Sequence, residues 1–200
     1  MADEPTEESA EGSEGIEHDG EEPAEGSENT SEGSEGSAEG SEDTELLHGV
    51  PVSDSFGQVV LHPDRDGYHG LVESLVEEGY RMCVDLAGVD YLGNEVRVLP
   101  ATVEPQRFEV AVNLLDLDER RRIRVRVQVP EDDATVATIT DIHPGAEAME
   151  REAMDMFGIS FDDHPDPTRI LLPEDWEGHP LRKDYAMGRI PVQFKAVEGR

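Results

Sequence analysis

The hydrophobic and polar positions of this chain first fall into a regular period near Tyr68, where order is expected to begin. In residues 69–80 the apolar side chains are spaced three and four apart, with glutamates between them. This spacing predicts an amphipathic helix of about ten residues, and Gly79 suits the left-handed position that follows a helix end. The apolar face consists of Leu71, Val72, Leu75 and Val76.

Three later segments alternate apolar and polar residues with a period of two, which predicts half-buried strands. The acidic connection LDLDER, residues 115–120, suits a hairpin between the second and third of them. A further short strand is expected within TVATITDI, residues 135–142. The apolar positions are Met82, Val84 and Leu86, then Phe108, Val110, Val112 and Leu114, then Ile123, Val125, Val127 and Val129.

Residues 143–158 predict a second helix, which His143 or Asp141 can cap and which Gly158 can end. Pro144 suits its first turn. A buried stripe of Ala146, Met149, Ala153 and Met156, extended by Phe157, follows the helical period. On the outer side Glu147, Arg151 and Asp155 are spaced four apart, so Arg151 is expected to pair in both directions.

These elements indicate an α+β fold: an antiparallel or mixed sheet of about four strands with two main helices. Residues 1–45 contain no Lys, Arg, Trp, Phe or Tyr and repeat a loose Glu-Gly-Ser unit, which predicts a disordered acidic tail. The expected organisation is a tail over 1–45, a linker or irregular start over 46–67, a domain over 68–191 and a C-terminal tail over 192–200.

Charge and cysteine content exclude several classes of protein. The formal net charge is −32, and residues 46–200 alone carry 30 acidic and 16 basic residues, a net −14. This argues against a nucleic-acid partner because phosphate binding needs a concentrated positive surface. Only two of the 16 basic residues are lysines, which favours a protein adapted to concentrated salt over an ordinary acidic protein. Cys83 is the single cysteine, so neither an internal disulfide nor a four-cysteine iron–sulfur cluster is expected.

The third predicted strand carries a basic strip in this acidic chain. Guanidinium groups pair with carboxylates through two hydrogen bonds, so the strip predicts either a docking surface for an acidic partner or a solvated strand face. The strip consists of Arg120, Arg121, Arg122, Arg124 and Arg126.

Candidate catalytic groups are few. Asp162, Asp163, His164 and Asp166 are competent metal ligands. His164 and Asp166 each precede a proline, which holds the backbone extended and is expected to spread these side chains apart. Glu152 and Asp155 are spaced for general acid–base work, although such pairs are common on helix surfaces. Trp176, the sole tryptophan, predicts either an interface anchor or a lid over the core.

The block EREAMDMFGISFDDHPDPTRILLPEDWEGHPLRKDY, Glu150 to Tyr185, resembles the signature of the thirty-kilodalton subunit of the NADH-quinone oxidoreductases of respiratory complex I. A weaker similarity reaches back through DLAGVDYL and the arginine-rich hairpin, so that the resemblance spans residues 68–191. The signature residues are Glu150, Arg151, Glu152, Asp155, Phe157, Gly158, His164, Pro165, Arg169, Trp176, Gly178, Pro180, Leu181, Arg182, Lys183 and Asp184.

The resemblance implies an accessory subunit of the hydrophilic arm with no cofactor of its own. Iron–sulfur clusters and quinone would lie in partner subunits, namely the quinone-site subunit and the iron–sulfur subunits. The chain would be peripheral, on the cytoplasmic side of the cell membrane. Residues 150–185 would serve assembly, with Arg182, Lys183 and Asp184 facing partner subunits.

Three alternatives stand beside this interpretation. One is the equivalent subunit of a related complex that accepts electrons from ferredoxin or reduced deazaflavin. Another is a free-standing metal-dependent enzyme that uses Asp162, His164 and Asp166. The last is an acidic interaction protein that acts through its tail.

Overall fold

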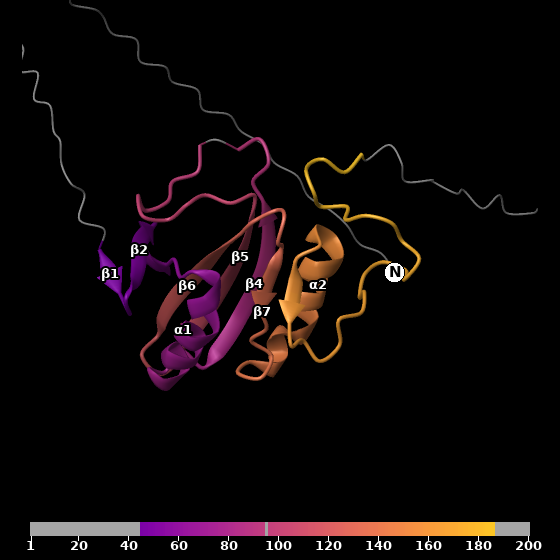
Figure 1. Ribbon diagram of the computed structural model, residues 1–200. Helices are drawn as coiled ribbons and strands as arrows, with labels where there is room; N and C mark the ends of the chain where they lie inside the picture. The colour runs from indigo at the N-terminus through magenta and orange to yellow at the C-terminus, as the bar shows by residue number, and fades with distance from the viewer. Residues whose placement is uncertain (1–44, 95, 187–200) are drawn as a thin grey trace, which may run out of the picture. The chain divides into compact units, whose positions relative to one another are not determined.

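The computed structural model describes residues 45–94 and 96–186, which form an α+β domain (Figure 1). The tail predicted for residues 1–45 lies outside this part of the chain except for Glu45, and so does the tail predicted for 192–200. A mixed sheet of six strands confirms the predicted class with more strands than expected. In spatial order the strands are β1 (Leu46–Leu47), β2 (Val50–Ser55), β3 (Gln58–Leu61), β6 (Arg121–Val129), β5 (Phe108–Asp116) and β4 (Met82–Asp90).

All neighbouring strands of this sheet run antiparallel except β3 and β6, which are parallel. A separate parallel pair joins β7 (Thr135–Ala137) to β8 (Ser160–Asp162). The helices are α1 (Arg65–Glu77) and α2 (Glu147–Phe157), the second preceded by the 3-10 turn η1 (Pro144–Ala146). Strand β7 therefore lies where a short strand was expected.

Residues 46–67, expected as a linker or irregular start, contain β1, β2, β3 and the start of α1. Phe56 and Gly57 turn the β2–β3 hairpin with φ of 56° and 79°, and the N–H of Gly57 donates to the Asp54 side chain at 2.9 Å. Helix α1 begins three residues before the expected Tyr68, because the Asp64 carboxylate caps it by accepting from the N–H of Gly67 at 2.6 Å.

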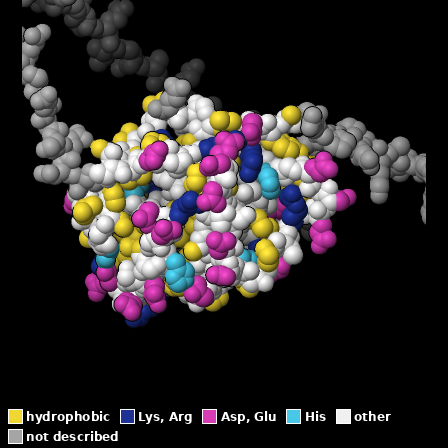
Figure 2. All heavy atoms as spheres, in the orientation of Figure 1, with side chains coloured by type: hydrophobic (Ala, Val, Ile, Leu, Met, Phe, Trp, Pro, Cys, Tyr) yellow, Lys and Arg dark blue, Asp and Glu magenta, His cyan; other side chains and the backbone are white. Residues whose placement is uncertain are grey.

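The core lies on one face of the sheet. The alternation predicted for β5 and β6 is confirmed, since the side chains of Val110, Val112, Val125 and Val127 are all fully buried. Helix α1 covers these strands, and α2 packs beside it against β4 (Figure 1). At the second contact, Cβ on Gly88 would lie 2.7 Å from the Phe157 ring, so only glycine allows α2 this close. Figure 2 shows this helical side of the molecule, with acidic side chains scattered over it.

Strand β4 departs from its predicted alternation. The pairing with β5 shifts between Cys83 and Asp85, which marks a bulge at Val84. Because the bulge adds one residue, Met82 and Val84 become exposed while Leu86 is buried. Cys83 is half-buried, and burial raises the pKa of its thiol to about 11.

Helix α2 ends as predicted, with Gly158 in the left-handed conformation at φ 71°. Its start differs: the His143 side chain makes no capping hydrogen bond, and Asp141 instead contacts His69 at 3.0 Å. Arg151 pairs with Glu147 at 3.5 Å, but its expected second partner, Asp155, is buried.

Candidate functional site

The carboxylate of Asp155, near the end of α2, organises the family signature block. It is 1 % exposed, and its Oδ2 accepts from the backbone N–H groups of Ile170 at 3.2 Å and of Leu171 and Leu172 at 2.9 Å each. The guanidinium of Arg169 donates to Oδ1. One carboxylate thus fixes four consecutive residues of the chain that follows the helix.

Arg169 continues this network into the loop that follows. Its Nη2 donates to the carbonyl oxygens of Trp176 at 3.0 Å and Gly178 at 3.3 Å. Nδ1 of His179 lies 3.0 Å from the carbonyl oxygen of Asp155. Because these partners are backbone atoms, they hold the shape of the loop rather than one side chain in it.

The next residues dock on the end of α2. The N–H of Leu181 donates to the carbonyl oxygen of Met156 at 3.1 Å, and Nε of Arg182 donates to that of Phe157 at 2.6 Å. These bonds satisfy carbonyl groups that a helix end leaves without partners. The Arg182 guanidinium also lies 5.0 Å from the centre of the Phe108 ring.

A second carboxylate, Asp90 at the end of β4, holds the last described residues. Its Oδ2 accepts from the N–H of Lys183 at 2.8 Å and from Arg107 at 3.1 Å. Arg107 in turn contacts Asp184 at 2.7 Å. The whole segment from His164 to Tyr185, which we call the closing strap, is therefore fastened at both ends to the domain.

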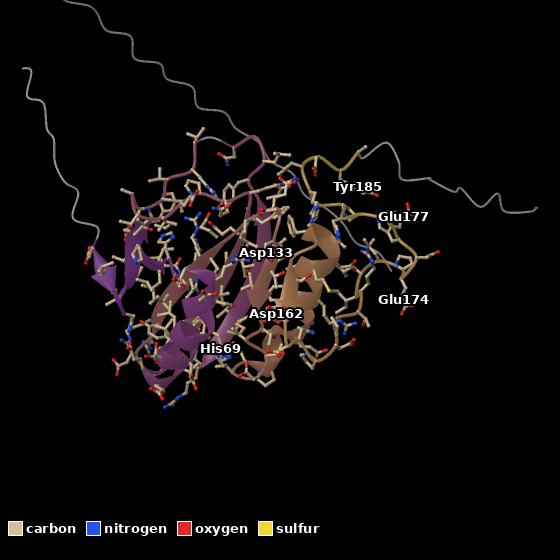
Figure 3. The ribbon with its side chains drawn as sticks, in the orientation of Figure 1. His69, Asp133, Asp162, Glu174, Glu177 and Tyr185 are labelled. Carbon is tan, nitrogen blue, oxygen red and sulfur yellow. The ribbon has the colours of Figure 1, made fainter. Side chains whose placement is uncertain are left out.

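The strap shows an apolar outer surface. Ile170, Leu171 and Leu181 are 40 %, 59 % and 48 % exposed, because the bonds to Asp155 and Met156 use their backbone and leave the side chains outward. Figure 3 places Glu174 and Glu177 on the outer side of the same strap, away from the sheet. The side chain of Lys183 is also exposed.

Electrostatics at the two anchoring carboxylates favour their charged forms. Burial alone would raise the pKa of Asp155, but the N–H groups of Leu172 and Leu171 and the Arg169 guanidinium together lower it. Burial opposes ionisation of Asp90 as well, and hydrogen bonds from Arg107 and Lys183 lower its pKa. Both anchors are therefore charged at neutral pH.

Glu150, on the buried side of α2, has its pKa shifted in the opposite direction. Burial raises its pKa, although its oxygens accept from the Thr138 hydroxyl at 2.5 Å and the Ile139 N–H at 2.8 Å. Its carboxylate ties α2 to the residues after β7. The ring of His164 packs beside it, with Nε2 3.8 Å from Glu150.

The structure does not assemble the metal site considered for Asp162, His164 and Asp166. Within residues 45–94 and 96–186, no group of three or more His, Cys, Asp or Glu side chains is arranged to hold a metal ion. Both ring nitrogens of His164 have backbone partners, the carbonyl oxygen of Glu147 at 3.2 Å and the N–H of Asp166 at 3.1 Å. Asp162 is the last residue of β8 and is exposed.

The three charges predicted to face partner subunits have different surroundings. The Arg182 guanidinium is used inside the chain, and the Asp184 carboxylate is shared with Arg107. Only Lys183 keeps its side chain exposed without an ion pair among the described residues. Arg182 is half-buried, and the docking of these three residues to partner subunits stays a prediction.

The remaining signature residues lie either in α2 and at its end or within the strap. Arg151, Phe157, Gly158 and Gly178 shape the strap contacts, and Cβ on Gly158 would lie 2.6 Å from both His179 and Arg182. Glu152, which was considered with Asp155 as an acid–base pair, is exposed, whereas Asp155 is buried. Pro165 is exposed, and Trp176 and Pro180 are half-buried within the strap.

The arginines of the predicted basic strip also differ in their surroundings. Arg121 pairs with Asp116 at 2.7 Å on the helical side, and Arg126 pairs with the buried Glu109 at 2.7 Å on the other side. Arg120 lies in the hairpin turn at φ 54°. Arg122 is exposed, and Arg124 donates only to the neutral side chain of Asn113, at 2.9 Å.

Sequence reasoning missed Asp90, Arg107 and Thr138 as parts of the site. Their partners lie up to 93 residues away, and no local pattern indicates such pairs. Glu150 had a signal, since it stands four residues after Ala146 and three before Ala153, on the predicted buried stripe. A charged residue in such a stripe indicates a buried partner.

Comparison with known proteins points to one family. Residues 61–190 match the family described as the respiratory-chain NADH dehydrogenase 30 kDa subunit. An NADH-quinone oxidoreductase subunit of Saccharopolyspora erythraea is 43 % identical over 145 residues, which cover 71 % of this chain and 55 % of that protein. NADH-quinone oxidoreductase subunit 5 of Thermus thermophilus is 39 % identical over 158 residues, 76 % of this chain and 72 % of that protein.

A solved structure is also similar to this chain. Nqo5, as a trypsin-resistant fragment of residues 1–134, has 32 % identity and a TM-score of 0.53, covering 59 % of this chain and 89 % of the fragment. The chain spans about half the length of several curated relatives it matches, from 45 % to 55 %. Neither helix of the described part has the length and apolar character needed to cross a membrane.

Proposed function

The chain belongs to the family of the respiratory-chain NADH dehydrogenase 30 kDa subunits, and from this premise we propose that it is an accessory subunit of a quinone-reducing membrane complex. In this role it binds no cofactor and carries out no chemistry alone. It docks to the quinone-site subunit and to the iron–sulfur subunits, and so supports electron transfer to quinone coupled to proton translocation. Its place is peripheral, on the cytoplasmic side of the membrane.

The observation that carries this proposal is the construction of the closing strap. Asp155 and Asp90 fix its backbone from inside, while Ile170, Leu171 and Leu181 remain outward. A surface that is already ordered loses little conformational entropy when a partner binds. Exposed apolar side chains on a rigid frame are typical of protein interfaces.

The polar network supports the same function. Its carboxylates, Asp155 and Asp90, are occupied by arginines and backbone N–H groups. The arrangement is suited to holding a shape and lacks the base and nucleophile geometry of an acid–base site. The equivalent subunit of a ferredoxin- or deazaflavin-dependent complex is the second candidate, because the electron donor binds to other chains.

The test is assembly in a bacterial strain that lacks its own thirty-kilodalton subunit. The full chain should enter the membrane complex and restore NADH-dependent quinone reduction. The double variant Leu171→Asp, Lys183→Glu should fold but fail to enter the complex, because it places carboxylates on the apolar strap surface. Native gel analysis of membranes and quinone reduction are measured together.

Val98→Asp is the matched control, since Val98 is 85 % exposed and lies in the loop between β4 and β5. This variant should assemble like the unmodified chain. Normal assembly of the strap variant with lost quinone reduction would contradict the docking role and indicate direct participation in catalysis.

A further inference from the structure

The sheet face turned away from α1 and α2 remains open over part of β4, β5 and β6. Strand register places Ala87, Ala111 and Arg126 side by side on this face, and Asp85, Asn113 and Arg124 form the next row. Ala87 and Asp85 are exposed, while Ala111 and Asn113 are only half-buried. Both described helices pack on the opposite face.

One end of this face is closed by the loop between β4 and β5. There the Arg97 guanidinium lies 4.1 Å from the centre of the Tyr91 ring, and Nη2 of Arg126 donates to the Tyr91 hydroxyl at 3.0 Å. Glu109, 1 % exposed, accepts from Arg126 at 2.7 Å and from Gln128 at 2.6 Å. The charge of Arg126 is therefore balanced inside the chain.

Arg122 and Arg124, nearer the other end, keep their positive charge unbalanced. Among the described residues, neither has a carboxylate within ion-pair distance, and the bond from Arg124 to Asn113 is to a neutral group. The nearest acidic position on this face by register is Asp85, across β5 on the edge strand. Two such guanidinium groups in a chain of net charge −32 mark a site that attracts carboxylates.

The spacing of the two arginines indicates the form of the ligand. Alternate residues on a strand stand about 6.8 Å apart. Carboxylates at positions i and i+4 of a helix stand about 6 Å apart along its axis, close to the spacing of the two arginines. The small side chains of Ala87 and Ala111 let a helix approach the sheet closely, as a second layer on a half-covered sheet requires.

We propose that this open face binds an amphipathic helix of a partner subunit. Two carboxylates of that helix, four residues apart, pair with Arg122 and Arg124, and its apolar residues cover Ala87 and Ala111. The proposal rests on the function proposed above and adds a second contact surface, on the side of the sheet opposite the helices.

Charge argues for this occupant over a second copy of the chain. Two copies joined face to face about a two-fold axis would bring their arginine rows together, and like charges in contact oppose association. A helix with carboxylates meets no such opposition.

The assembly assay in the strain without its own thirty-kilodalton subunit tests the proposal with two kinds of variant. Arg122→Glu with Arg124→Glu reverses the charge, and Ala87→Trp blocks close approach. Each should lower the amount of chain in the complex about tenfold or more. Arg81→Glu and Ala148→Trp, exposed positions outside this face, are the controls and should assemble normally. Melting of each purified full-length variant shows whether it has folded.

A cross-linking measurement identifies the occupant. In assembled complexes that contain Arg122→Lys, a carbodiimide should join the new amine to a carboxylate in a helix of another subunit, read by mass spectrometry. A cross-link to a second copy, to a non-helical segment or to none overturns the helix assignment. Failure of the unmodified chain to assemble would overturn the proposed function as well, whereas normal assembly of both face variants would overturn this inference alone.

Discussion

The backbone N–H of Lys183 donates a 2.8 Å hydrogen bond to the carboxylate of Asp90, which stands 93 residues earlier in the chain. The same carboxylate accepts from the N–H of Leu92 at 2.9 Å and from Arg107. One side chain at the end of β4 therefore joins the following loop, the start of β5 and the end of the strap. The position of the strap surface is set by the sheet.

Asp155→Asn should destabilise the domain by about 3 kcal/mol, because it leaves the partly buried Arg169 without its counter-charge. The strap should loosen. Trypsin should then cleave the variant after Arg169 and Arg182 at trypsin concentrations that leave the unmodified chain intact. Asp166→Asn is the control: Asp166 is 45 % exposed and 3.2 Å from Arg151, so its loss should change stability by less than about 1 kcal/mol. Urea unfolding and timed proteolysis measure both effects.

Stability should fall in acid. The folded-state pKa values of Asp90 and Asp155 are lowered, so each contributes stability that is present above its unfolded pKa and lost as pH falls through the folded value. Melting temperatures between pH 6 and pH 3 should drop steeply at the acidic end. The drop should be smaller in Asp155→Asn; an equal drop in both proteins would show that Asp155 is not a source of it.

Glu150 should show the opposite pH dependence. Burial raises its folded-state pKa, so its contribution is fully present below the unfolded pKa and is lost as pH rises through the folded value. Glu150→Gln should therefore gain stability relative to the unmodified chain between pH 4 and pH 7. Glu150→Leu should instead lose about 1–3 kcal/mol for each partner left unpaired, Thr138 and Ile139, in chemical denaturation.

Gly158→Ala should destabilise more than Gly93→Ala. Both glycines have positive φ, 71° and 77°, so each substitution incurs about 1 kcal/mol of backbone strain. A Cβ at Gly93 meets nothing within 4 Å, whereas at Gly158 it meets His179 and Arg182 at 2.6 Å. The difference between the two variants in urea unfolding measures the strap contact, and equal losses would mean that the strap moves aside freely.

Added salt should raise the melting temperature of the full chain. Residues 46–200 carry 30 acidic and 16 basic residues, a net charge of −14, so their carboxylates repel one another in the folded state. The Debye length falls from about 30 Å at 0.01 M salt to about 3 Å at 1 M, which removes most of that repulsion. Scanning calorimetry across this range tests the effect; an unchanged melting temperature would contradict the interpretation that the composition suits concentrated salt.

The fold was predictable where residues repeat with a clear period. The buried positions of β5 and β6 follow from alternation alone, and Gly158 marks the end of α2. The β2–β3 hairpin was missed because Phe56, rather than Asn or Asp, precedes the turn glycine. The bulge at Val84 was missed because its effect, an inverted exposure pattern, appears only when β4 pairs with β5.

The candidate site was predictable as a segment and not as a network. The signature block contains Asp155, Arg169 and Arg182, but nothing in it indicates that the first is buried and that the others bind carbonyl groups. Those facts depend on how the strap lies against α2. The helical period places Asp155 on the outer side of α2. In the structure, however, the irregular strap packs over that side and buries it.

The contact of the strap with Asp90, Phe108 and Phe157 also sets an order of events during synthesis. The strap leaves the ribosome after the strands and helix that it binds, and contacts across such long sequence separations form slowly. In a nascent domain with a misformed β4 or α2, the strap has no place to dock. The apolar side chains of the strap then do not reach their final arrangement. The final arrangement of this surface therefore depends on the prior folding of β4, β5 and α2.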